Sequence, residues 1–79
     1  MKIKVGKYYL DGNGIVRYVS RFNADDYFFP YVCDGKNNVT HIKFTANGSF
    51  LAFNAKKSKN DLVKEITKEN DPQYFIWAK

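Results

Sequence analysis

The amino-acid sequence predicts a mostly β fold built on one small, strongly bent antiparallel sheet. Short runs rich in Tyr, Phe, Val and Ile recur along the chain, and these residues suit a half-buried pleated surface. Clusters of Gly, Asn and Asp separate the runs, so that a strand begins about every 12 residues. The Asn-Gly pairs within these clusters are typical of tight hairpin turns. No rhythm of strands and long helices is present, which argues against a parallel α/β sheet.

The apolar runs place strands at 2–10, 15–22, 27–33, 39–45, 49–54 and 73–78. Alternation is clearest in the fourth run, where Ile42 and Phe44 fall on one face and His41 and Lys43 on the other. We expect the face of His41 and Lys43 to be in water.

In the second run, strict alternation puts Arg17, Val19 and Arg21 on one side of the strand, and we expect Arg17 and Arg21 to point outward. The third run is apolar on both faces. It contains Pro30, which has no N–H to offer a central strand, so this run should lie at a sheet edge or a barrel corner.

Residues 60–69 fit two structures. Leu62, Val63 and Ile66 suit the apolar stripe of a short helix, and Ser58 with Asp61 resembles a capping box, so we predict a short helix here. The same residues also alternate well enough for a closing strand, and that alternative stays open.

Consecutive hairpins with short loops favour a sheet that closes, or nearly closes, on itself, because closure hides the strand edges. A small SH3-like barrel is therefore the expected architecture. A chain of 79 residues has room for one core, so we expect a single domain over 1–79. The predicted core consists of Ile3, Val5, Tyr18, Phe29, Ile42, Phe44 and Phe50.

Cysteine content and hydropathy bear on the cellular compartment. Cys33 is the single cysteine and cannot form an internal disulfide. No secretory leader is apparent at the N-terminus, and no apolar run reaches the roughly 18–20 residues that a membrane span needs. We expect a soluble, cytoplasmic protein.

Formal charge is +5, and the basic residues are unevenly placed: residues 1–59 hold ten Lys and Arg against four Asp and Glu. Such a balance favours an anionic partner, either nucleic acid or an acidic protein surface, although it also serves solubility. With one His and one Cys, the chain offers too few groups for a nucleophile with its base, or for a metal site. We predict no enzymatic activity, no cofactor and no metal.

Aromatic side chains interleaved with basic ones form the candidate binding surface. Rings stack on bases and Tyr and Arg dominate protein-binding hot spots, while core packing competes for the same rings. The candidate binding residues are Arg17, Arg21, Tyr27, Tyr31, Lys36, His41 and Lys43, with Tyr8 beside them.

Several segments in order resemble a pattern in small bacteriophage accessory proteins. They are Val-Gly-Lys-Tyr-Tyr at 5–9, the aromatic run at 27–31 after an acidic turn, Thr-Ala-Asn-Gly-Ser-Phe at 45–50 and Asp-Leu-Val-Lys-Glu-Ile at 61–66. The resemblance spans 5–66. It implies a phage setting, in which proteins of this size often bind and inhibit a host or defence component in the host cytoplasm.

Three hypotheses follow. The first is a non-catalytic, phage-type accessory or anti-defence protein that inhibits a host protein with an acidic surface. The second is a small barrel that binds nucleic acid or nucleotides. The third is a structural subunit that associates with copies of itself.

Overall fold

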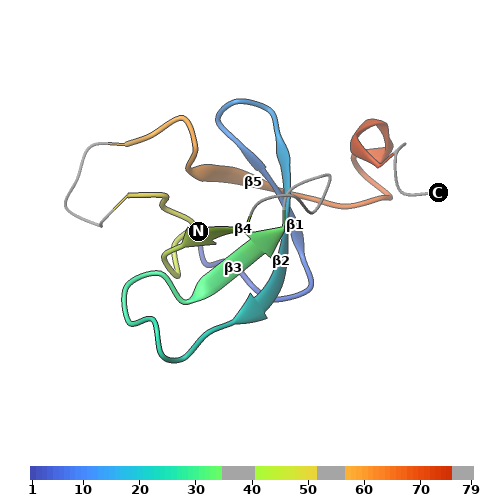
Figure 1. The fold of residues 1–79 in the computed structure, drawn as a ribbon. Helices are drawn as coiled ribbons and strands as arrows, with labels where there is room; N and C mark the ends of the chain where they lie inside the picture. Colours follow the sequence, from blue (N-terminus) through green and yellow to red (C-terminus); the bar gives the residue numbers. More distant parts are fainter. Residues whose placement is uncertain (35–40, 52–56, 76–79) are drawn as a thin grey trace.

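The computed structural model describes residues 1–34, 41–51 and 57–75, and its core element is one antiparallel sheet (Figure 1). The sheet order is β4-β3-β2-β1-β5, so the first four strands form a meander and the last returns to pair with the first. The elements are β1 Tyr8–Asp11, β2 Val16–Phe22, β3 Tyr31–Asp34, β4 His41–Phe44, β5 Leu62–Ile66 and a 3-10 turn, η1, at Pro72–Tyr74. The predicted small, strongly bent antiparallel sheet is confirmed.

The sheet curls so far that the segment after β4 reaches the strand at the other edge. The N–H of Leu62, the first residue of β5, donates to the carbonyl of Gly48 at 2.8 Å. The Phe50 N–H donates to the carboxylate of Asp61 at 2.8 Å. The N-terminal segment binds the same turn, since the Ile3 N–H donates to the Ala46 carbonyl at 3.0 Å. The two edges are therefore joined through residues 45–50, as expected for a nearly closed sheet.

The concave side of the sheet holds the main core. Its buried members are Ile3, Tyr9, Val19, Cys33, Phe44 and Leu62. The predicted core is confirmed for Ile3 and Phe44, while Ile42 and Phe50 are partly buried and pack against the cluster. Val5 was expected in the core but is 48% exposed, because the chain turns at Val5 and Gly6 before β1 begins.

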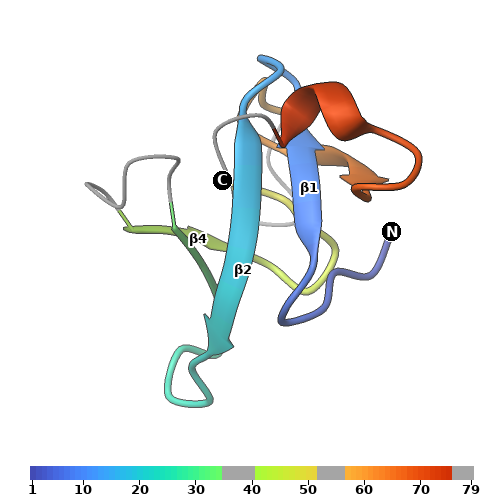
Figure 2. The same cartoon turned by 90° about the vertical axis from the view of Figure 1, so that its right-hand side faces the viewer.

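A second apolar layer lies on the opposite side, where η1 folds back over β1 (Figure 2). Leu10, Ile66 and Phe75 form this layer, and the Phe75 ring meets the Tyr8 ring edge-on at 4.9 Å. The Tyr18 ring also contacts Tyr8, with the two rings tilted and their centroids 4.7 Å apart. The prediction of Tyr18 in the main core is therefore wrong, since its ring is half-buried and contacts the second layer.

A β-bulge in β2 changes which side chains share a face. Val19 pairs with Cys33 and Arg21 pairs with Val32, so Ser20 is the extra residue on the β2 side. A bulge of one residue reverses the alternation beyond it. Arg17 therefore shares the concave face with Val19, whereas Arg21 lies on the convex face with Tyr18.

Several expected elements differ from the observed ones. The predicted helix at 60–69 is wrong, because β5 occupies Leu62–Ile66 and the closing strand forms instead. The strand forms because its backbone pairs with β1, and its two buried residues, Leu62 and Ile66, contact the two apolar clusters. The third strand begins only at Tyr31, and it lies between β2 and β4 rather than at an edge. Pro30 precedes it, so that its missing N–H falls outside the ladder.

The two remaining predicted strands fall partly outside the described residues. Residues 49–51 form no strand, and 52–54 lie beyond the described range. The 3-10 turn η1 and Phe75 occupy the described part of 73–78, because Pro72 fixes a turn there. Across the described part of the chain, no helix has the length and apolar character needed to cross a membrane.

Candidate functional site

An open hollow of about 390 Å³ lies between the β2–β3 loop and the turn that follows β4. Volumes of this order are typical of small binding sites. Its lining carries no formal charge and mixes rings with small polar side chains: Tyr27, Phe28, Pro30, Thr45, Ala46, Asn47 and Ser49.

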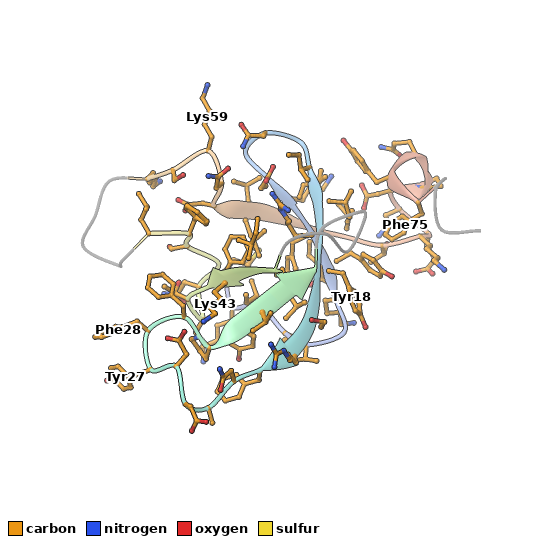
Figure 3. All side chains as sticks on the ribbon, viewed as in Figure 1. Tyr18, Tyr27, Phe28, Lys43, Lys59 and Phe75 are labelled. Atoms are coloured by element: carbon orange, nitrogen blue, oxygen red, sulfur yellow. The ribbon has the colours of Figure 1, made fainter. Side chains whose placement is uncertain are left out.

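Two aromatic side chains form one wall and stand away from the body of the sheet (Figure 3). Tyr27 is 86% exposed and Phe28 is 54% exposed. Their rings meet edge-on, with centroids 4.9 Å apart. Large apolar rings that are exposed and grouped, rather than scattered singly, are typical of interaction surfaces.

Hydrogen bonds inside the β2–β3 loop hold this wall in place. The Asn23 N–H donates to the Pro30 carbonyl at 2.6 Å and closes the base of the loop. Asp26 Oδ1 accepts the Phe29 N–H at 3.0 Å. Tyr27 and Phe28 are the two residues between these partners, so they are forced to the outside of the loop.

The acidic turn is tied to the sheet by one ion pair. Lys43 Nζ, from β4, lies 3.3 Å from Asp26 Oδ2. The Phe29 N–H, and secondly Lys43, lower the pKa of Asp26 below its ordinary value. Lys43 was predicted to offer a free positive charge to a partner, but much of that charge is balanced by Asp26.

The opposite wall is the five-residue turn 45–49. The Thr45 N–H donates to the Ser49 carbonyl at 3.0 Å, and the Gly48 N–H donates to the Thr45 carbonyl at 2.9 Å. Gly48 has φ +87°, a left-handed conformation that glycine adopts without strain. The turn leaves Asn47 exposed at the lip of the hollow.

Arg17 does not reach this surface. Only 12% of its side chain is exposed, and its Nε lies 3.5 Å from Oδ2 of Asp11, whose side chain is fully buried. The expectation that Arg17 points outward with Arg21 is therefore wrong. The bulge at Ser20 separates the two arginines onto opposite faces, and Asp11 gives Arg17 a charged partner inside.

The other predicted binding residues are dispersed. Arg21 is exposed, and it shares the convex face with Lys43, on either side of Val32. Tyr31 is half-buried, packs against the core and contacts the Phe22 ring at 5.1 Å. His41 pairs with Asp34 across β3 and β4, and its side chain lies outside the described residues, as does Lys36.

Among the predicted binding residues whose side chains the structure describes, Tyr27 alone lines the hollow. The sequence reasoning missed Phe28 and Pro30 as site residues because it treated 27–33 as one strand. It recognised a turn at 46–48, but no local pattern placed that turn opposite the β2–β3 loop. A signal for Phe28 was present: three aromatics directly after two aspartates and directly before a proline are unsuited to a paired strand, and they favour a loop that displays its rings.

No protein-family model, curated protein or solved structure matches this chain.

Proposed function

We propose that this chain is a non-catalytic binding protein that holds a partner protein through the hollow beside Tyr27 and Phe28. The observation that carries the proposal is the pair of exposed, mutually packed rings on a loop that is hydrogen-bonded in place. Aromatic side chains bury roughly 150–250 Å² each and are enriched among the residues that dominate protein interfaces. A loop already held in shape loses little conformational entropy on binding.

Charge near the hollow favours a protein over a nucleic acid. The two segments that line it, 23–30 and 45–51, contain Asp25 and Asp26 but no Lys or Arg. The nearby Lys43 is paired with Asp26. Nucleic-acid binding depends on cations that contact phosphates, and two aspartates beside the rings would repel that backbone. The phage setting and the inhibition of a host or defence protein, which the resemblance implies, are the biological form that we propose for this binding.

Site-specific photocrosslinking tests the proposal. A photoreactive phenylalanine at position 27 should capture one discrete protein from a host-cell lysate, with or without nuclease. The same group at Val63, which is 61% exposed but does not line the hollow, is the matched control and should capture none. Loss of the product on nuclease treatment, or a product that is a second copy of this chain, would overturn the proposal in favour of nucleic-acid binding or self-association.

Once the captured protein has been purified, its affinity for this chain can be measured directly. The double variant Tyr27→Ala/Phe28→Ala should bind it more weakly than the wild type by about 2 kcal/mol or more, mainly through faster dissociation. Val63→Ala should bind as the wild type does. Equal affinity of the double variant and the wild type would place the interface elsewhere.

A further inference from the structure

The chain contains two five-residue turns of the same construction, and each has Asn-Gly at its third and fourth positions. One runs from Asp11 to Ile15 and the other from Thr45 to Ser49. In both, the N–H of the first residue donates to the carbonyl of the fifth, at 3.0 Å, and the glycine N–H donates to the carbonyl of the first, at 3.0 and 2.9 Å. The glycines have φ +78° and +87°.

The side chain of the first residue plays the same part in both turns. Asp11 Oδ1 accepts the Ile15 N–H at 2.9 Å, and Thr45 Oγ1 accepts the Ser49 N–H at 3.1 Å. The two turns therefore have the same internal hydrogen bonds around their Asn-Gly peptides. Their outer surroundings differ, since Gly48 is buried and its carbonyl also accepts the Leu62 N–H at 2.8 Å, whereas Gly14 is exposed.

The two asparagines differ in what holds them. Asn13 Nδ2 donates to Asn60 Oδ1 at 2.9 Å, and the Asn13 N–H donates to Asp11 Oδ1 at 2.9 Å. Asn47 is exposed, and it makes no hydrogen bond with any described residue. Two hydrogen bonds restrain Asn13, whereas no described residue restrains the side chain of Asn47.

We propose that Asn47 is a site of spontaneous chemical modification, deamidation, and that Asn13 is protected from the same reaction. The Gly48 backbone nitrogen loses its proton and attacks the side-chain carbonyl carbon of Asn47. The bond from that carbon to the amide nitrogen breaks, and the nitrogen leaves as ammonia with the proton. Water then opens the resulting succinimide ring at either carbonyl, which leaves aspartate or isoaspartate. One water enters, one ammonia leaves, and nothing is oxidised or reduced.

Glycine is the residue that least obstructs this attack, because it has no side chain. The attack also requires the turn to open, since the glycine N–H is hydrogen-bonded in both turns. Opening of the turn at Asn47 also breaks the bond from the Leu62 N–H to the Gly48 carbonyl. The asparagine side chain must in addition rotate toward the glycine nitrogen, and for this Asn13 must leave Asn60, whereas Asn47 leaves no described partner. Asn47 therefore reacts first.

Modification of Asn47 changes the hollow. It places a carboxylate, or with isoaspartate an additional backbone carbon, at a lip that carries no charge. If the hollow binds the partner as proposed above, deamidation of Asn47 should weaken that binding as the protein ages.

The test is a timed incubation of the full-length chain in mildly alkaline buffer, followed by peptide mapping with mass spectrometry. Deamidation replaces NH by O in the side chain, and this mass change should appear about fivefold faster at Asn47 than at Asn13. That factor corresponds to the ordinary net free energy of one hydrogen bond, the one between Asn13 and Asn60. In concentrated urea the two sites should react at nearly equal rates, which separates the effect of the fold from that of sequence. Equal rates in native buffer, or faster reaction of Asn13, overturn the proposal.

Two variants complete the design. Asn60→Ala, checked for folding by circular dichroism, should raise the rate at Asn13 and leave Asn47 unchanged; an unchanged rate at Asn13 would refute the protection by Asn60. Asn47→Asp should reduce the affinity for the captured partner, and equal affinity would refute the effect on binding. Because the mapping needs no partner, failure of the proposed function would leave the modification result intact.

Discussion

Arg17 and Asp11 form an ion pair inside the sheet, with Nε 3.5 Å from Oδ2. Neither of these two atoms makes a hydrogen bond within the described part of the chain. The other carboxylate oxygen accepts the N–H groups of Asn13 and Ile15, both at 2.9 Å. The Asp11 carboxylate thus holds the β1–β2 turn together, and Arg17 balances the negative charge of this buried carboxylate.

Removal of Arg17 should therefore destabilise the protein. Breaking a buried pair leaves one charge without compensation, which typically costs about 3–5 kcal/mol. We expect Arg17→Ala to lie near the lower end of that range, because two backbone N–H groups still bind Asp11. Urea unfolding measures the loss. Arg21→Ala, at an exposed position of the same strand, is the matched control and should change stability by less than about 0.5 kcal/mol. Equal effects of the two variants would contradict the burial of Arg17.

Truncation of Phe44 should cost most of the stability of so small a domain. Phe44 is fully buried at the centre of the concave core. Phe→Ala substitutions at such positions cost about 3–5 kcal/mol. Thermal unfolding followed by circular dichroism is the measurement, with Phe28→Ala as the control at an exposed ring. A cooperative transition near that of the wild type would show that Phe44 does not hold the core together.

Alanine should be tolerated less well at Gly48 than at Gly14. Both residues have positive φ, so both variants lose about 1–2 kcal/mol to backbone strain. A Cβ at Gly48 would additionally lie 3.1 Å from Cβ of Leu62, whereas a Cβ at Gly14 meets no atom within 4 Å. The difference between the two urea midpoints tests the packing of turn 45–49 against β5, and equal midpoints would argue against it.

Acidification should remove a stabilising contribution from Asp26. Its pKa is lower in the folded protein than in the unfolded chain, chiefly because the Phe29 N–H binds the ionised carboxylate. The contribution is therefore complete above the unfolded pKa of about 3.9, and it is lost as pH falls through the lower, folded value. Stability measured against pH should fall less steeply for Asp26→Asn than for the wild type in that range. Parallel curves would show that Asp26 does not contribute.

Pattern in the sequence was sufficient for the fold class and for the strands whose alternation is simple. In β4, His41–Phe44, alternation correctly predicted that Phe44 faces the core. The turn residues marked the hairpins because a left-handed backbone conformation favours glycine, whatever lies around it. These features depend on local chemistry, which a sequence contains in full.

Only the tertiary structure determined which sheet face the side chains after the bulge in β2 occupy. The burial of Arg17 and the position of the hollow also became known only from it. A single unpaired residue, Ser20, reverses the alternation of β2, and its position depends on how β3 pairs with that strand. Arg17 is buried because Asp11 from the neighbouring strand balances its charge. The hollow joins residues near 28 to residues near 47, which come together only when the sheet curls. Each of these features depends on contacts between distant segments, and no local pattern specifies them.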